Sequence, residues 1–121
     1  MKPDKKELKK HYLQTPPAMG VFQVKNITDG KILVVSARNL PGIMNSYRFQ
    51  LNQGSCHIQE LQSDYTRLGA QNFLFEVLDT LKPAEDPNAD PAGDLRTLEE
   101  MWIERLQPFG SRGYHQRKPG K

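Results

Sequence analysis

The carboxylate of Glu99 is the first candidate for chemistry in this sequence, because it lies beside the apolar stripe of a predicted helix. That stripe recurs at helical spacing and comprises Leu95, Leu98, Met101, Trp102 and Leu106. At about 100° per residue, Glu99 lies about 40° from the start of the stripe, whereas Glu100 and Glu104 point away from it. A carboxylate facing the packed side is costly unless it is paired or bound to a metal. Three interpretations stay open: an ion pair with a nearby basic residue such as Arg38 or Arg48, a position at the rim of the packed face, and a metal ligand.

Cysteine and histidine are too sparse and too scattered for a structural zinc site. Cys56 and His57 are adjacent, whereas His11 and His115 lie near opposite ends of the chain. Structural zinc sites need several such ligands at set spacings. A single cysteine forms no intramolecular disulfide, so we expect a reducing, cytoplasmic compartment. No apolar segment follows the charged start of the chain, so the sequence predicts neither a signal peptide nor a membrane partner.

The basic side chains are concentrated at the two ends of the chain. Residues 1–12 carry a net charge of +3 and residues 107–121 carry +4, whereas residues 13–106 hold eight basic and twelve acidic side chains. A footprint for nucleic-acid phosphates would therefore be built from the ends. Its candidate residues are Lys5, Lys6, Lys9, Lys10, Arg112, Arg117 and Lys118. The alternative is that both ends are simply solvated.

The first half of the sequence predicts a polar helix, a β-hairpin and a second helix. The polar helix covers residues 3–13 and is broken by prolines. Residues 19–37 favour a hairpin, because β-forming runs flank a tight turn at Asp29-Gly30. A helix then begins at Asn39-Leu40-Pro41 and ends at Gly54. Its apolar stripe comprises Ile43, Met44, Tyr47 and Leu51.

The second half predicts a helix, a strand and a final helix. The helix carries a stripe from Ile58 to Leu68 and is capped by Gly69. Residues 72–79 predict a strand with at least one fully buried face, and residues 83–93 predict an exposed loop. Asp94 is expected to cap the last helix. This order predicts an α/β (α+β) domain: a small antiparallel three-stranded sheet flanked by helices, behind an extra N-terminal helix.

The ordered set of segments resembles the GIY-YIG nuclease family over residues 19–115. The segments that carry the resemblance are Gly20 to Asn26, Gly30 to Ser36, Asn39-Leu40, Cys56-His57 through Leu78, and Glu99-Glu100-Met101-Trp102-Ile103. We accordingly divide the chain into a basic helix and proline linker (1–18), a GIY-YIG-like domain (19–115) and a basic tail (116–121).

The resemblance implies metal-assisted phosphodiester cleavage, yet most of the implied catalytic groups are absent. The family's two strand tyrosines, helix arginine and terminal asparagine fall on Phe22, Leu33, Ile43 and His115. Glu99 alone keeps its identity, as the residue that would hold Mg²⁺ or another divalent cation. His57 matches a histidine of some members and is a candidate phosphate contact.

The sequence therefore predicts a degenerate GIY-YIG-like domain that binds DNA or RNA with weak or no phosphodiesterase activity. One alternative is an active metal-dependent endonuclease with a rearranged site. The other is a non-catalytic protein-interaction domain that uses a vacated apolar cleft near Phe22 and Leu33. The sequence leaves the oligomeric state open.

Overall fold

The computed structural model describes residues 17–82 and 90–115. The predicted helix over residues 3–13 and most of the predicted loop over residues 83–93 lie outside these ranges. Within them, no helix is long and apolar enough to cross a membrane.

The predicted β-hairpin is present. Strands β1 (Met19–Asn26) and β2 (Ile32–Ala37) pair antiparallel, with Phe22 opposite Val35. In the turn, the side-chain oxygen of Asn26 accepts hydrogen bonds from the backbone N–H groups of Thr28 and Asp29, at 3.0 and 3.2 Å. Gly30 has a φ of 80°, a conformation that side chains disfavour, which explains the glycine at this position.

The next two helices begin and end close to the predicted residues. Helix α2 (Leu40–Gln53) is capped by the Asn39 side chain, which accepts from Gly42 N at 3.0 Å, and ends at Gly54. Helix α3 (Gln59–Leu68) follows a short connection and ends at Gly69, whose N–H donates to Tyr65 O. The predictions that Gly54 and Gly69 end these two helices are therefore confirmed.

Strand β3 (Phe73–Leu81) corrects one prediction. It pairs antiparallel with β1, so the sheet order is β2-β1-β3 and β3 lies at an edge. Phe73 is buried, but Val77 is 44% exposed, so neither face of this strand is fully buried. A register shift opposite Val21 and Phe22 also interrupts the alternation. An apolar pattern alone does not distinguish a central strand from an edge strand.

Helix α4 (Ala92–Leu106) starts earlier than predicted. Asp94 lies in its first turn, and it is the side chain of Asp90 that accepts from Ala92 N, at 3.0 Å. Of the predicted stripe, Leu95 is buried whereas Met101 is 46% exposed. A short 3₁₀ turn, Gly110–Arg112, follows α4 and leads into the last described residues.

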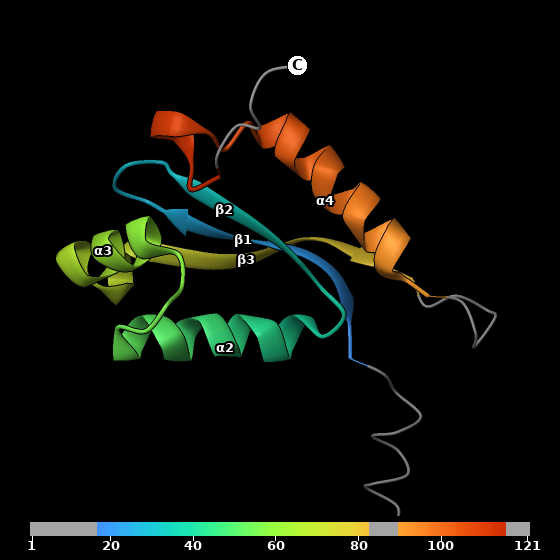
Figure 1. The fold of residues 1–121 in the computed structure, drawn as a ribbon, viewed down its shortest axis with the longest axis horizontal. Coiled ribbons are helices and arrows are strands. Elements are labelled where there is room, and N and C mark those ends of the chain that lie inside the picture. The colour runs from blue at the N-terminus through green and yellow to red at the C-terminus, as the bar shows by residue number, and fades with distance from the viewer. Residues whose placement is uncertain (1–16, 83–89, 116–121) are drawn as a thin grey trace, which may run out of the picture.

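The helices cover both faces of the sheet, with α2 and α3 on one side and α4 on the other (Figure 1). The main core lies between the sheet and α2 and α3, and includes Phe22, Val24, Leu33, Leu40, Leu51, Leu61 and Phe73. The opposite face of β1 and β2 buries Val21 and Val34, which alternation directs toward α4. Because both of its faces are covered, β1 is the most buried strand. The predicted α+β architecture is confirmed.

Candidate functional site

The residues at the family's two strand-tyrosine positions belong to the core. Phe22 is 0% exposed and Leu33 is 4% exposed. The ring of Phe22 meets the ring of Tyr47 edge-on, with 5.9 Å between centroids. Both side chains therefore pack within the core.

The arginine position of the first helix is also apolar, and neither Arg38 nor Arg48 replaces it. Ile43 is 37% exposed on α2, so it is a surface residue rather than part of the core. The guanidinium of Arg48 lies 4.6 Å from the ring centroid of Phe75, a residue of β3. Arg38 pairs with Asp90 at 2.6 Å. Both arginines are therefore engaged away from the Phe22 position.

Glu99 faces the end of β2, beside Ser36. Burial raises the pKa of its carboxyl, and the backbone and hydroxyl of Ser36 partly oppose that shift by hydrogen bonding. In residues 17–82 and 90–115, no ion pair within 4.0 Å joins Glu99 to Arg38 or Arg48. The ion pair expected with Arg38 or Arg48 is not formed. Instead Ser36 donates hydrogen bonds to Glu99, because a strand end offers hydrogen-bond donors, and the charge of Arg96 also lowers the pKa of Glu99.

The donor set around Glu99 fits a multi-ligand metal centre poorly. No group of three or more His, Cys, Asp or Glu side chains converges within the described part of the chain. Phe22 and Leu33 contribute no ligand atoms. A hard cation such as Mg²⁺ prefers oxygen ligands, and here Glu99 would be its single carboxylate.

The outer edge of β2 is covered by the segment from Gly110 to His115, which we call the edge strap. Tyr114 N donates to Ile32 O at 3.1 Å, and Val34 N donates to the imidazole Nε2 of His115 at 2.9 Å. Burial lowers the pKa of His115. The bond from Val34 also needs the lone pair of a neutral ring. His115 therefore has a definite structural role at the edge of the sheet.

A polar cluster anchors the edge strap to α3 and to the hairpin. The hydroxyl of Tyr114, a buried residue, donates to Asp64 Oδ2 at 2.9 Å and accepts from Asn26 Nδ2 at 3.2 Å. Lys31 and Arg67 also contact Asp64, at 3.5 and 3.2 Å. Burial raises the pKa of Asp64, but these hydrogen bonds and charges outweigh it, so the pKa is lowered overall. Asp64 is therefore held as a carboxylate.

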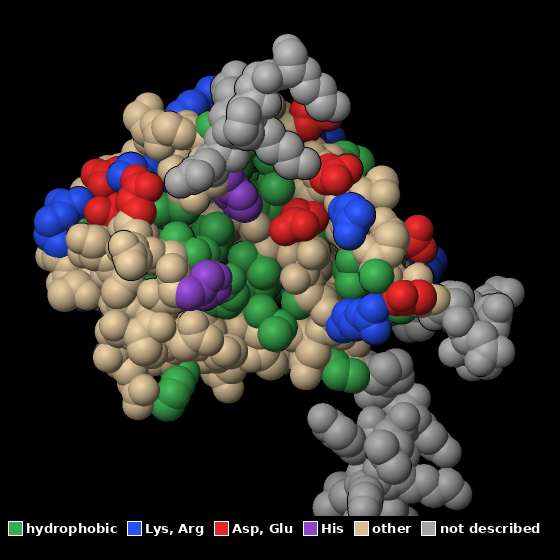
Figure 2. Space-filling view, viewed as in Figure 1, with side chains coloured by type: hydrophobic (Ala, Val, Ile, Leu, Met, Phe, Trp, Pro, Cys, Tyr) green, Lys and Arg blue, Asp and Glu red, His purple; other side chains and the backbone are tan. Residues whose placement is uncertain are grey.

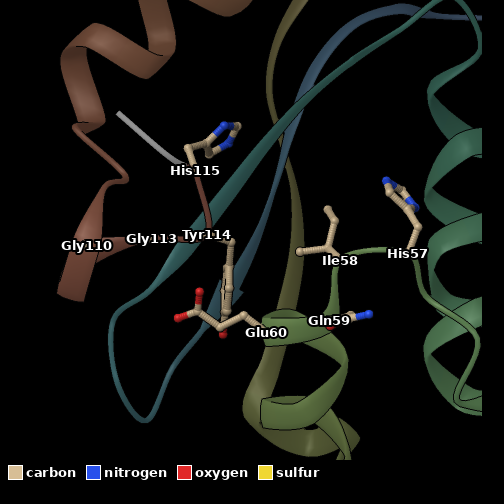
Figure 3. A pocket seen from close by; sticks show the side chains of 8 residues that line it. All are labelled: His57, Ile58, Gln59, Glu60, Gly110, Gly113, Tyr114 and His115. Atoms are coloured by element: carbon tan, nitrogen blue, oxygen red, sulfur yellow. The ribbon is translucent and has the colours of Figure 1, made fainter. Parts of the chain in front are cut away.

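An open cleft of about 700 Å³ separates the edge strap from the start of α3 (Figure 3). Its lining residues are His57, Ile58, Gln59, Glu60, Gly110, Gly113, Tyr114 and His115. His57 and His115 stand on opposite walls (Figure 3). Figure 2 shows apolar side chains gathered in a hollow on this face, flanked by histidine and bordered by acidic side chains. The cleft brings together two predicted site residues that are 58 positions apart in the sequence.

Three residues of this region were not singled out from the sequence. The Tyr47 ring lies 6.0 Å from the His57 ring, and burial, followed by Cys56 and Glu99, raises the pKa of its hydroxyl. Asp64 is buried on α3, three residues after Leu61 of its stripe, and this spacing was a usable signal. No comparable feature of the sequence pointed to Tyr114.

Most of the predicted phosphate-binding residues lie outside the described ranges, namely Lys5, Lys6, Lys9, Lys10, Arg117 and Lys118. Arg112 is described and is exposed in the turn that begins the edge strap. The described structure thus places one basic candidate beside the cleft.

Two solved structures have a similar fold. One is the catalytic domain of the homing endonuclease I-TevI, with a TM-score of 0.63 and 22% identity, covering 79% of this chain and 95% of that domain. The other is a glutamate-to-alanine variant of the same catalytic domain, with a TM-score of 0.62 and 20% identity, covering 74% of this chain and 84% of the other. No protein-family model and no curated protein matches the chain. I-TevI is a GIY-YIG nuclease, and the protein therefore has a GIY-YIG-like fold.

Proposed function

We propose that this protein binds nucleic acid through a GIY-YIG-like domain and has weak or no phosphodiesterase activity. The observation that carries the proposal is the continuity between the cleft and a basic segment. His115 lines the cleft, and Arg117 and Lys118 follow it in the sequence without an intervening acid. The sequence therefore places two basic residues, which can contact phosphate, directly after a residue of the cleft.

Loss of the polar groups at the family positions supports weak catalysis. Phe22 and Leu33 have no atom that could orient or deprotonate a water molecule, and Ile43 cannot neutralise a phosphoryl oxygen. General acid–base help is worth about 10²–10⁴-fold in rate, and a charged donor at the developing negative charge typically contributes at least about 10²-fold. Without these groups, Glu99 alone would provide only a small part of the rate enhancement that the family resemblance implies.

Salt titration of binding tests the proposal. Fluorescence anisotropy should detect binding of short DNA and RNA oligonucleotides by the full chain, with an affinity that falls as salt rises. Replacing both Arg117 and Lys118 by alanine should lower the salt slope by about one to two. The matched control replaces Arg38 and Arg105, which lie outside the cleft lining, and should change the slope less. Binding that is absent, or that is insensitive to salt, would overturn the proposal.

An active endonuclease with a rearranged site is the second candidate, and Tyr47 is the observation that favours it. Its ring touches both Phe22 and His57, so its hydroxyl is near the position that lost a tyrosine. This candidate predicts Mg²⁺- or Mn²⁺-dependent cleavage that Glu99→Ala abolishes and Tyr47→Phe reduces. Cleavage that survives Glu99→Ala would point to a contaminating nuclease.

A further inference from the structure

We infer that the cleft between α3 and the edge strap holds an unpaired nucleobase rather than a phosphate group. The inference rests on the proposed function and specifies which part of the nucleic acid contacts the cleft. It assigns His57 and His115 to the base and leaves phosphate contacts to the basic residues outside the cleft.

Charge argues against a phosphate in the cleft. No lysine or arginine is among its described lining residues, and its one ionisable acid, Glu60, would repel an anion. Lys31, whose ammonium lies over the ring of the lining residue Tyr114, is already paired with Glu60 at 2.9 Å and with Asp64 at 3.5 Å. His115 is neutral, because its Nε2 accepts a hydrogen bond from Val34 N. A phosphate inside the cleft would therefore lose water without contacting a cation among the described lining residues.

The shape and composition of the cleft suit a planar, uncharged heterocycle. Two imidazole rings stand on opposite walls (Figure 3), and the apolar side chain of Ile58 lies between them. Tyr47 backs the His57 ring at 6.0 Å and so limits its movement. The volume of about 700 Å³ is within the roughly 300–1,000 Å³ of small-ligand sites. Aromatic rings stack on any base, so this arrangement recognises a base without fixing its identity.

The wall that carries His115 is held in place before a ligand arrives. A side chain at Gly113 would meet the carbonyl oxygen of Pro108 at 2.1 Å, so the strap and the end of α4 are in close contact. Tyr114 fixes the strap through Ile32, Asn26 and Asp64. A preformed wall lowers the entropic cost of binding.

A base in this cleft must be free of its partner, which predicts a preference for single strands. In a duplex the base faces are stacked and cannot enter unless the nucleotide is extruded. We therefore expect single-stranded DNA or RNA to bind more tightly than the matched duplex.

The experiment compares three ligands of equal length by fluorescence anisotropy: a single strand, its duplex, and a single strand whose central positions are abasic. The full-length wild type is measured beside His57→Ala and His57→Phe. His57 is exposed, so neither variant should alter folding, and thermal melting checks this. We expect His57→Ala to weaken single-strand binding by roughly tenfold, with the salt slope and duplex affinity unchanged. His57→Phe, which keeps a ring, should recover most of the loss.

The outcomes separate the two proposals. No binding of any ligand overturns the proposed function and this inference with it. Salt-dependent binding in which the abasic strand binds as tightly as the intact strand overturns the inference alone. An equal loss on single strand and duplex with His57→Ala also overturns it, because His57 would then contact the backbone.

Discussion

Both β2 and β3 are edge strands, but the rest of the chain covers them differently. Along β2, Tyr114 and His115 satisfy backbone groups of Ile32 and Val34, and Glu99 faces Ser36. Along β3, Val77 remains 44% exposed. Two of the predicted site residues, His115 and Glu99, contact the covered edge.

Covering an edge also limits unwanted pairing with other chains. The edge strap does this with a polar segment whose hydrogen bonds are specific in direction, which positions His115 as well as protecting β2. The following variants test this difference between the β2 and β3 edges, from the largest expected effect to the smallest.

Tyr114→Phe should cause the largest loss of stability. The change removes the hydroxyl that joins Asn26 and Asp64, and so takes one hydrogen bond from each of two buried polar side chains. We expect a loss of about 2–3 kcal/mol in the free energy of unfolding, measured by urea denaturation. The Asp64 pKa is lowered, so its contribution is present above its ordinary value of 3.8 and lost as pH falls through the folded-state pKa.

The matched control is Tyr65→Phe, which removes a hydroxyl whose acceptor, Asn52, is exposed. It should cost less than about 1 kcal/mol. Equal losses in the two variants would contradict the importance of the polar cluster.

His115→Ala should loosen the β2 edge locally. Val34 N loses its acceptor, at an expected cost of about 1–2 kcal/mol, and its amide hydrogen should exchange faster. The lowered pKa of His115 means that the unfolded chain takes the proton first. Wild-type stability should therefore fall as pH drops below 6.5, and His115→Gln should lack this part of the slope. If the amide hydrogen of Val34 exchanged at the same rate in His115→Ala, the proposed role of the edge strap would be contradicted.

Glu99→Gln should have a small effect in the opposite direction. The pKa of Glu99 is raised, so the ionised form is disfavoured in the fold above that pKa, and the penalty disappears as pH falls toward 4.5. Because the carboxyl is only half-buried, we expect a gain of up to about 0.5 kcal/mol at pH 7. Thermal melting at pH 7 and pH 4.5 checks the sign. A loss above about 1 kcal/mol would show that the fold needs the carboxylate.

Val77→Thr, on the open edge, should change stability by less than about 0.5 kcal/mol. The same substitution at Val34, which is 1% exposed on the covered edge, buries a hydroxyl and should cost about 1–3 kcal/mol. Similar effects of the two substitutions would remove the distinction between the edges.

Local signals in the sequence were sufficient for the fold. The Asp29-Gly30 turn, the Asn39 cap and the Gly54 and Gly69 stops each depend on a few neighbouring residues, so they could be read directly. The burial of β3 could not, because Phe73 and Val77 belong to the same apolar pattern and only the strand order makes β3 an edge.

The candidate site was predicted less completely, because it depends on contacts between distant segments. Glu99 was identified from its place beside the apolar stripe of its helix, and His57 and His115 through the family resemblance. However, the ion pair expected between Glu99 and Arg38 or Arg48 is not formed. Tyr114 was missed, since its role comes from Asn26 and Asp64, which are 88 and 50 positions away. Tyr47 was predicted to belong to an apolar stripe. Only the packing of α2 beside His57 shows that the Tyr47 ring also lies against the His57 ring.

The most direct test measures binding and cleavage on the same labelled nucleic acids, with Mg²⁺ or Mn²⁺ present, for the wild type and Glu99→Ala. The account predicts salt-dependent binding by both proteins, and cleavage by the wild type that is slow or absent. Rapid metal-dependent cleavage by the wild type that disappears in Glu99→Ala would contradict it, and would show that the rearranged site is active.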